Sequence, residues 1–280
     1  IEHQILNNMS DNDLIHSLER KLLKSVESQM LSDVPIGSLL SGGIDSSLIT
    51  ALMQKISNQP IKTFTIGFDD RHFNEAEHAL LISNHLQTDH NELYVSSEDS
   101  LSVVPYLASF WDEPFADSSQ IPTFLVMRLA SKNIKVALSG DGADELFGGY
   151  NRYRFAPKIW KQIGWMPNQL KIFISKLLTS IPASKLDSIS FPISKFIGVS
   201  QIGQKMHKLG NRFSQFNSLD KFYLSLVSEW PNVDKILLNY KEPLYLLNDF
   251  KNWPNTADPA TRMMALDSLT YLPDDILTKV

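Results

Sequence analysis

The sequence predicts an α/β fold: a parallel twisted sheet with helices on both faces, followed by a helical C-terminal extension. Up to about residue 155, short apolar segments alternate with longer segments of helical apolar spacing, which is the pattern of a parallel sheet with crossover helices. Two of the apolar segments run directly into loops of glycine, serine and carboxylate residues. Open sheets of this class bind ligands at the carboxyl ends of their strands, so the two loops are expected to share one crevice.

The elements of the sheet follow one another in order. Amphipathic spacing predicts a first helix over 11–31, the apolar run 34–40 predicts the first strand, and a helix begins close to Asp45. The same reasoning predicts strands over 63–68, 92–95 and 135–138, and helices over 74–86, 100–111 and 120–132.

From Phe155 onward, apolar and aromatic residues keep helical spacing and show no convincing period-two strand. We therefore divide the chain into an N-terminal amphipathic helix that packs on the domain (1–29), a core (30–155) and a helical subdomain (156–280). The last of these is expected to be incomplete.

The first loop reads Ser-Gly-Gly-Ile-Asp-Ser-Ser from Ser41 to Ser47. Its glycines can take positive φ and let the backbone approach an anion, and the amides that open the following helix favour negative charge. The loop lacks the spacing and the lysine of a Walker A loop. Asp45 stands there instead, which predicts that Mg²⁺ carries the positive charge between the protein and a pyrophosphate. An ordinary strand-to-helix turn is the alternative.

The second loop runs from Ser139 to Tyr150 and reads Ser-Gly-Asp-Gly-Ala-Asp-Glu-Leu-Phe-Gly-Gly-Tyr. Asp141, Asp144 and Glu145 place three carboxylates within five residues, which is costly without a cation. They are therefore interpreted as metal-holding or catalytic residues, with a solvated acidic turn as the alternative.

Together the two loops resemble the synthetase domain of glutamine-hydrolysing asparagine synthetases, which are PP-loop ATP pyrophosphatases with an adenine nucleotide alpha hydrolase-like fold. The segments 65–68, 112–119 and 271–280 also fit this family. The resemblance is dense over 30–150 and at the C-terminus, and nothing specific is recognised between about 156 and 255. It implies that 30–155 is the ATP-binding PP-loop core and that an upstream glutaminase domain is absent from this chain.

The resemblance implies a ligase that forms asparagine from aspartate and ammonia through β-aspartyl-AMP, releasing AMP and pyrophosphate. In the full protein the ammonia would come from glutamine. Asp141 stands where bacterial members carry a glutamate linked to acyl-adenylate formation, so its arm is one methylene shorter. This leaves open another carboxylate acceptor, such as a cell-surface sugar acid. An inactive nucleotide-binding module and a pyrophosphatase acting on tRNA or a nucleotide also stay open as functions.

The resemblance also implies roles for individual residues. Asp141 and Lys279 are the expected catalytic residues, and Asp45 and Asp144 the expected Mg²⁺ ligands. Leu40 and Ile66 would flank adenine, with plain sheet core as the alternative, and a helix-surface lysine is the alternative for Lys279. The full set expected to bind ATP is Leu40, Ser41, Gly42, Gly43, Asp45, Ser46, Ile66, Ser139 and Gly140.

The segment between these motifs gives a weaker hypothesis. Asp112, Glu113 and Asp117 are candidates for lining the acceptor side of the site, with a capped turn as the alternative.

Composition sets the remaining limits. The chain has 280 residues, of which 43% are hydrophobic and 20% charged, and it shows no signal-peptide pattern and no run of ~20 apolar residues, so a cytoplasmic protein without membrane contact is expected. It contains no cysteine, which excludes disulfides and thiolate sites. Residues 1–150 carry 9 basic and 21 acidic side chains, which argues against a nucleic-acid partner. A homodimer is left open.

Overall fold

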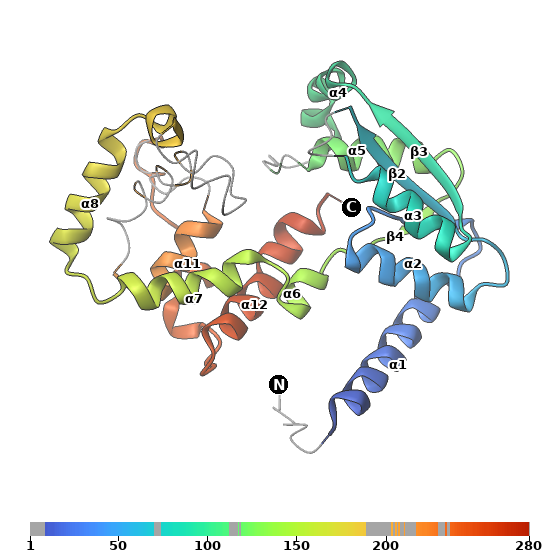
Figure 1. Cartoon of the computed structure of the whole chain (residues 1–280), viewed down its shortest axis with the longest axis horizontal. Helices are drawn as coiled ribbons and strands as arrows, with labels where there is room; N and C mark the ends of the chain where they lie inside the picture. The colour runs from blue at the N-terminus through green and yellow to red at the C-terminus, as the bar shows by residue number, and fades with distance from the viewer. Residues whose placement is uncertain are drawn as a thin grey trace. The chain divides into compact units, whose positions relative to one another are not determined.

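The computed structural model describes residues 9–69, 74–111, 117, 119–188, 217–228 and 236–279, with Gly203, Lys205, His207, Gly210 and Val233. They form two compact units (Figure 1). The first contains the chain up to Ala143 together with the segment Pro273–Val280, and the second is Asp144–Leu272. Along the chain, the boundary between the two units therefore lies after Ala143, earlier than residue 155. The C-terminal segment belongs to the first unit and not to the helical one.

A four-stranded parallel sheet forms the centre of the first unit. Its strands are β1 (Ile36–Leu39), β2 (Lys62–Phe68), β3 (Asp89–Val95) and β4 (Val136–Leu138), in the order β3-β2-β1-β4. The chain adds β2 and β3 on one side of β1 and then crosses to place β4 on the other side. The strand order thus reverses between β1 and β4, which is where open sheets of this class form a ligand crevice.

Helices cover both faces of this sheet, as the sequence predicts. On one face α2 and α3 pack against β1 and β2, with α1 packed on α2, and on the other face α5 packs against β2 beside α4. The helices are α1 (Asp11–Gln29), α2 (Ile44–Ile56), α3 (Ala76–Leu86), α4 (Ser97–Phe110) and α5 (Gln120–Ala130).

The alternation of side chains along the strands explains the two layers. Phe64 is fully buried against Ala130 and Ile134 beneath α5. Its neighbour Thr63 points to the other face and shares a hydrogen bond of 3.0 Å with Thr88. A strand with both faces covered is expected in a parallel sheet.

Helices are the regular secondary structure of the second unit among its described residues, and 236–245 form turns and irregular structure. The unit comprises α6 (Ala143–Phe147), α7 (Asn151–Ile163), α8 (Asn168–Ser180), α11 (Leu219–Val227) and α12 (Pro259–Leu269), with short turns at Leu246–Asn248 and Phe250–Asn252. α7 packs against α11 and α12 around an apolar core. A short helix, Leu272–Ile276, leads back to the first unit. No helix among the described residues combines the length and apolar character needed to cross a membrane.

A buried aspartate joins three helices of the second unit. Asp267 on α12 is 0% exposed and accepts hydrogen bonds of 2.6 Å from the hydroxyls of Tyr153 and Tyr223. Arg152 Nε donates to the same carboxylate at 2.8 Å, and Nη2 forms an ion pair with it at 2.8 Å. Burial raises the pKa of both tyrosines, and the hydrogen bonds to Asp267 raise it further, so both hydroxyls stay protonated donors. The arginine also lies over the ring of Tyr150, 3.9 Å from its centroid.

Candidate functional site

Hydrogen bonds of its own serine hydroxyl groups stabilise the loop between β1 and α2. The Ser46 hydroxyl lies 2.9 Å from Ser41 Oγ and accepts a hydrogen bond of 3.2 Å from Ser41 N. Gly43 N in turn donates to Ser41 Oγ at 3.3 Å. Gly43 is the N-cap of α2, and no side chain forms a capping hydrogen bond to the first amides of this helix. Such amides are a ready anion site.

Gly42 gives this loop its shape. Its φ is 82°, in the left-handed region, and a Cβ at this position would lie 2.7 Å from both Ala79 N and His78 Cβ. The loop therefore lies directly against the first turn of α3. Only a residue without a side chain satisfies both conditions.

We expect Gly42→Ala to destabilise the first unit by about 2–3 kcal/mol, because the new methyl group meets backbone while the residue is held at positive φ. ATP affinity should fall with it. Gly43→Ala is the matched control: its Cβ would meet only Ser41 Oγ, at 3.3 Å, so it should cost less than about 1 kcal/mol. Urea unfolding of both variants checks this, and equal losses would contradict it.

The second loop packs on the first. β4 pairs with β1, and a Cβ on Gly140 would lie 2.8 Å from Ser46 N and 2.9 Å from the carbonyl carbon of Asp45. The two backbones are thus in contact at the point where the strand order reverses. The residues brought together are Ser41, Gly42, Gly43, Asp45, Ser46, Ser139 and Gly140, all expected from the sequence to bind ATP.

Oxygen atoms suited to Mg²⁺ lie at this junction. Asp45 is half-buried and Asp141 is exposed, and within the described part of the chain neither carboxylate has a hydrogen-bond or ion-pair partner. The Ser47 hydroxyl is buried and also lacks a partner there. No group of three or more metal-ligating side chains exists among the described residues. The oxygen donors present are nevertheless of the kind that Mg²⁺ accepts, since it usually binds through one or two carboxylates together with substrate phosphates.

Asp144 belongs to the second unit, and a glycine makes room for it. Gly149 has no Cβ, and a Cβ there would collide with the carboxylate of Asp144. The amides of Gly148 and Gly149 donate to the Asp144 carbonyl at 2.8 and 3.0 Å. The role of Asp144 as a second Mg²⁺ ligand stays a prediction.

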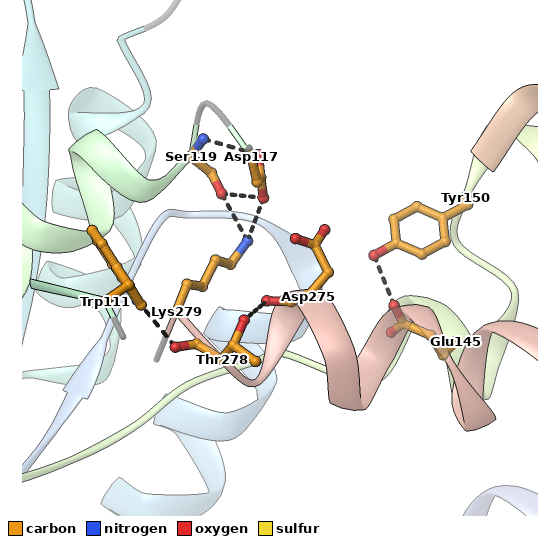
Figure 2. Close-up of polar contacts among 8 residues, drawn as sticks. All are labelled: Trp111, Asp117, Ser119, Glu145, Tyr150, Asp275, Thr278 and Lys279. Carbon is orange, nitrogen blue, oxygen red and sulfur yellow. Dashed lines mark hydrogen bonds and ion pairs between the residues drawn. The ribbon is translucent and has the colours of Figure 1, made fainter. Parts of the chain in front are cut away.

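Glu145, the third carboxylate of this cluster, is buried and binds Tyr150 through one of its two oxygens. It is 1% exposed and accepts a hydrogen bond of 2.8 Å from the Tyr150 hydroxyl (Figure 2). Burial raises the pKa of Tyr150, and the hydrogen bond to Glu145 raises it further. The tyrosine therefore remains a donor over the physiological range.

Lys279 is held within the first unit by two side chains that lie some 160 residues earlier. Its Nζ lies 2.8 Å from Ser119 Oγ and 3.1 Å from Asp117 Oδ2 (Figure 2). Its side chain is 10% exposed, so it is not a surface lysine, although its catalytic role stays a prediction. Sequence reasoning missed Ser119, for which the Asp-x-Ser spacing of a side-chain-capped turn was the available signal. Asp112 and Glu113 lie outside the described residues.

Comparison with known proteins agrees with this arrangement. The family model for asparagine synthase matches residues 17–279. The chain belongs to the asparagine synthase family. It is 30% identical to asparagine synthetase [glutamine-hydrolyzing] 1 of Bacillus subtilis, over 96% of this chain and 45% of that protein. It is 31% identical to a putative asparagine synthetase of Mycobacterium bovis, over 98% of this chain and 39% of that protein.

The chain thus spans less than half the length of these curated relatives. Among solved structures, NMN synthetase from Francisella tularensis shares 16% identity, with a TM-score of 0.36 over 49% of this chain and 59% of that one. An NH3-dependent NAD synthetase from Campylobacter jejuni shares 13%, with a TM-score of 0.35 over 72% of this chain and 94% of that one.

In this asparagine synthase family chain, the residues expected to flank adenine differ in position: Leu40 directly follows β1, whereas Ile66 lies within β2 rather than at its end. Leu40 is 1% exposed, and its amide donates to the Phe64 carbonyl at 2.9 Å. Ile66 packs against the apolar cluster of Val95, Val103 and Leu125. Both side chains thus contribute to the sheet core, and contact of either one with adenine stays a prediction.

Proposed function

We propose that this chain is the synthetase part of a glutamine-hydrolysing asparagine synthetase. It would form asparagine from aspartate, ammonia and ATP through β-aspartyl-AMP and release AMP and pyrophosphate. The observation that carries the proposal is the contact between the Ser41–Ser47 loop and Gly140 at the reversal of strand order, in a chain of the asparagine synthase family. The names of the relatives supply asparagine as the product and glutamine as the nitrogen source.

The loop residues would act mainly on the leaving group. A carboxylate oxygen of aspartate attacks the α-phosphate of ATP, and the bond to the bridging oxygen breaks as pyrophosphate leaves. The uncapped amides at the start of α2 would receive the charge that develops there. Mg²⁺, held by Asp45 and Asp144, would supply the countercharge for the phosphates.

The acyl side of the reaction would use Asp141 and Lys279. We assign Asp141 to the adenylation step, where the acceptor carboxylate meets the α-phosphate. Ammonia then attacks the acyl carbon, AMP leaves and a proton is lost. The Lys279 ammonium would stabilise negative charge in these transition states. Ammonia would come from a glutaminase domain of the full-length protein, and the cytoplasm is the expected location.

Isotope exchange between pyrophosphate and ATP tests the function. The full-length protein is incubated with Mg²⁺, without ammonia or glutamine, and with aspartate or another carboxylic acid. We expect exchange with aspartate, and none when the metal is removed by chelation or Asp45 is replaced by alanine. Exchange with another acid alone would keep the chemistry and overturn asparagine as the product. No exchange with any acid would overturn the ligase assignment in favour of a binding module.

A further inference from the structure

The Lys279 ammonium is held by a side-chain pair that is itself fixed. Asp117 accepts hydrogen bonds from Ser119 N at 2.9 Å and from Ser119 Oγ at 2.5 Å, which locks the two residues into one turn. Lys279 Nζ donates to both members of this turn, to Asp117 Oδ2 at 3.1 Å and Ser119 Oγ at 2.8 Å. Figure 2 shows the ammonium between them.

The backbone that carries Lys279 is anchored separately. The indole Nε1 of Trp111 donates to the carbonyl of Thr278 at 3.1 Å, and the Thr278 hydroxyl donates to the carbonyl of Asp275 at 2.7 Å. Both ends of the lysine side chain are thus fixed to the first unit. A free lysine side chain would lose about 2 kcal/mol of rotamer entropy on being ordered, and here this ordering precedes substrate binding.

The contact leaves the ammonium able to act on a substrate. An ammonium has three N–H donors, and within the described part of the chain two of them are taken, by Asp117 and Ser119. Burial raises the pKa of Asp117, but the hydrogen bonds from Ser119 and Lys279 outweigh this, and its pKa lies below the ordinary value. The carboxylate therefore stays charged and keeps its hold at neutral pH.

We propose that Asp117 and Ser119 are positioning residues for amide-bond formation, which fix the Lys279 ammonium so that its third N–H meets the negative charge of the reacting groups. This role rests on the proposed ligase function. In this role, neither Asp117 nor Ser119 touches the substrate. Both act by holding a catalytic cation in place, where a displacement of about 1 Å can cost ~100-fold in rate.

The first test asks whether Asp117 and Ser119 hold the Lys279 ammonium, and it does not depend on enzymatic activity. Lysines of the full-length protein are acetylated with a limiting reagent and read by mass spectrometry. Lys279 should react more slowly than Lys55, whose side chain is 59% exposed. Asp117→Asn and Ser119→Ala should raise the rate at Lys279 towards that of Lys55. Asp99→Asn is the matched control, because Asp99 accepts from the amide and hydroxyl of Ser96 at 2.9 and 2.6 Å and pairs with no lysine among the residues that the structure describes. Unchanged labelling of Lys279 would overturn the proposal.

The second test asks whether the contact serves the reaction. We expect Asp117→Asn and Ser119→Ala to lower kcat ~10- to 100-fold while the KM for ATP stays constant, and Ser119→Thr, which keeps the hydroxyl, to restore most of it. Asp99→Asn should match the wild type. Faster labelling with unchanged kcat would overturn the positioning role and leave the ligase function standing. A wild-type protein inactive with every acid would instead overturn the ligase function, and this role with it.

Discussion

Asp45→Asn should lower the rate of pyrophosphate exchange by ~10²- to 10³-fold and raise the Mg²⁺ concentration needed for half-maximal activity. The reason is that Asp45 lies in the loop that would hold the phosphates, and the amide keeps the size of the carboxylate but not its charge. Its carboxylate has no side-chain partner within the described part of the chain and contributes only through its place in the first turn of α2, so the free energy of unfolding should fall by less than about 1 kcal/mol. Steady-state exchange over a series of Mg²⁺ concentrations, together with urea unfolding, measures both quantities.

The control for this variant is Asp33→Asn, which removes one exposed carboxylate from the same unit ahead of β1. It should leave the exchange rate and the Mg²⁺ dependence at wild-type values. An Asp45→Asn protein with wild-type Mg²⁺ dependence would show that this carboxylate does not hold the metal.

Asp267→Ala should destabilise the second unit by about 3–5 kcal/mol, because it leaves the partly buried Arg152 without its anion and two tyrosine hydroxyls without their acceptor. Tyr153→Phe and Tyr223→Phe each remove one hydrogen bond to a charged group and should cost about 1.5–3 kcal/mol. Urea unfolding followed by circular dichroism measures these losses.

Asp220→Ala is the matched control for Asp267. Asp220 pairs with Arg262 at 3.4 Å in the same unit, but both side chains are about one-third exposed. Such pairs contribute about 0–1 kcal/mol. Similar losses in the two aspartate variants would mean that the Asp267 network adds little to stability.

The sheet could be predicted because its signals are local. Each predicted strand is present, and the differences lie at the ends. β1 begins at Ile36 rather than Val34, since Pro35 has no amide to donate and instead accepts from Lys135 N at 2.9 Å. β3 begins at Asp89, three residues before the predicted start at Glu92, because it pairs along its whole length with β2. The polar residues at the start of β3 give no sequence signal for a strand, because their place in it depends on backbone pairing with β2.

Within the site, too, the features set by local sequence could be predicted and those set by tertiary contacts could not. The two loops are contiguous in sequence, so their glycines and carboxylates could be recognised directly. The pairing of Lys279 with Asp117 joins residues 162 positions apart, and no periodicity connects them. Asp267 lies in the last turn of an ordinary helix and differs from a surface aspartate only through its tertiary partners. The unit boundary before residue 155 follows from packing as well, because α7 buries its apolar face against α11 and α12.

The return of the C-terminal segment to the first unit has a consequence for synthesis. A ribosome completes all four strands and the first loop by Leu138, but it must then make the whole of Asp144–Leu272 before Lys279 emerges. The nascent chain can therefore form its nucleotide cradle while the cation proposed to act there does not yet exist. Vectorial translation would in this way couple the onset of turnover to completion of the helical unit.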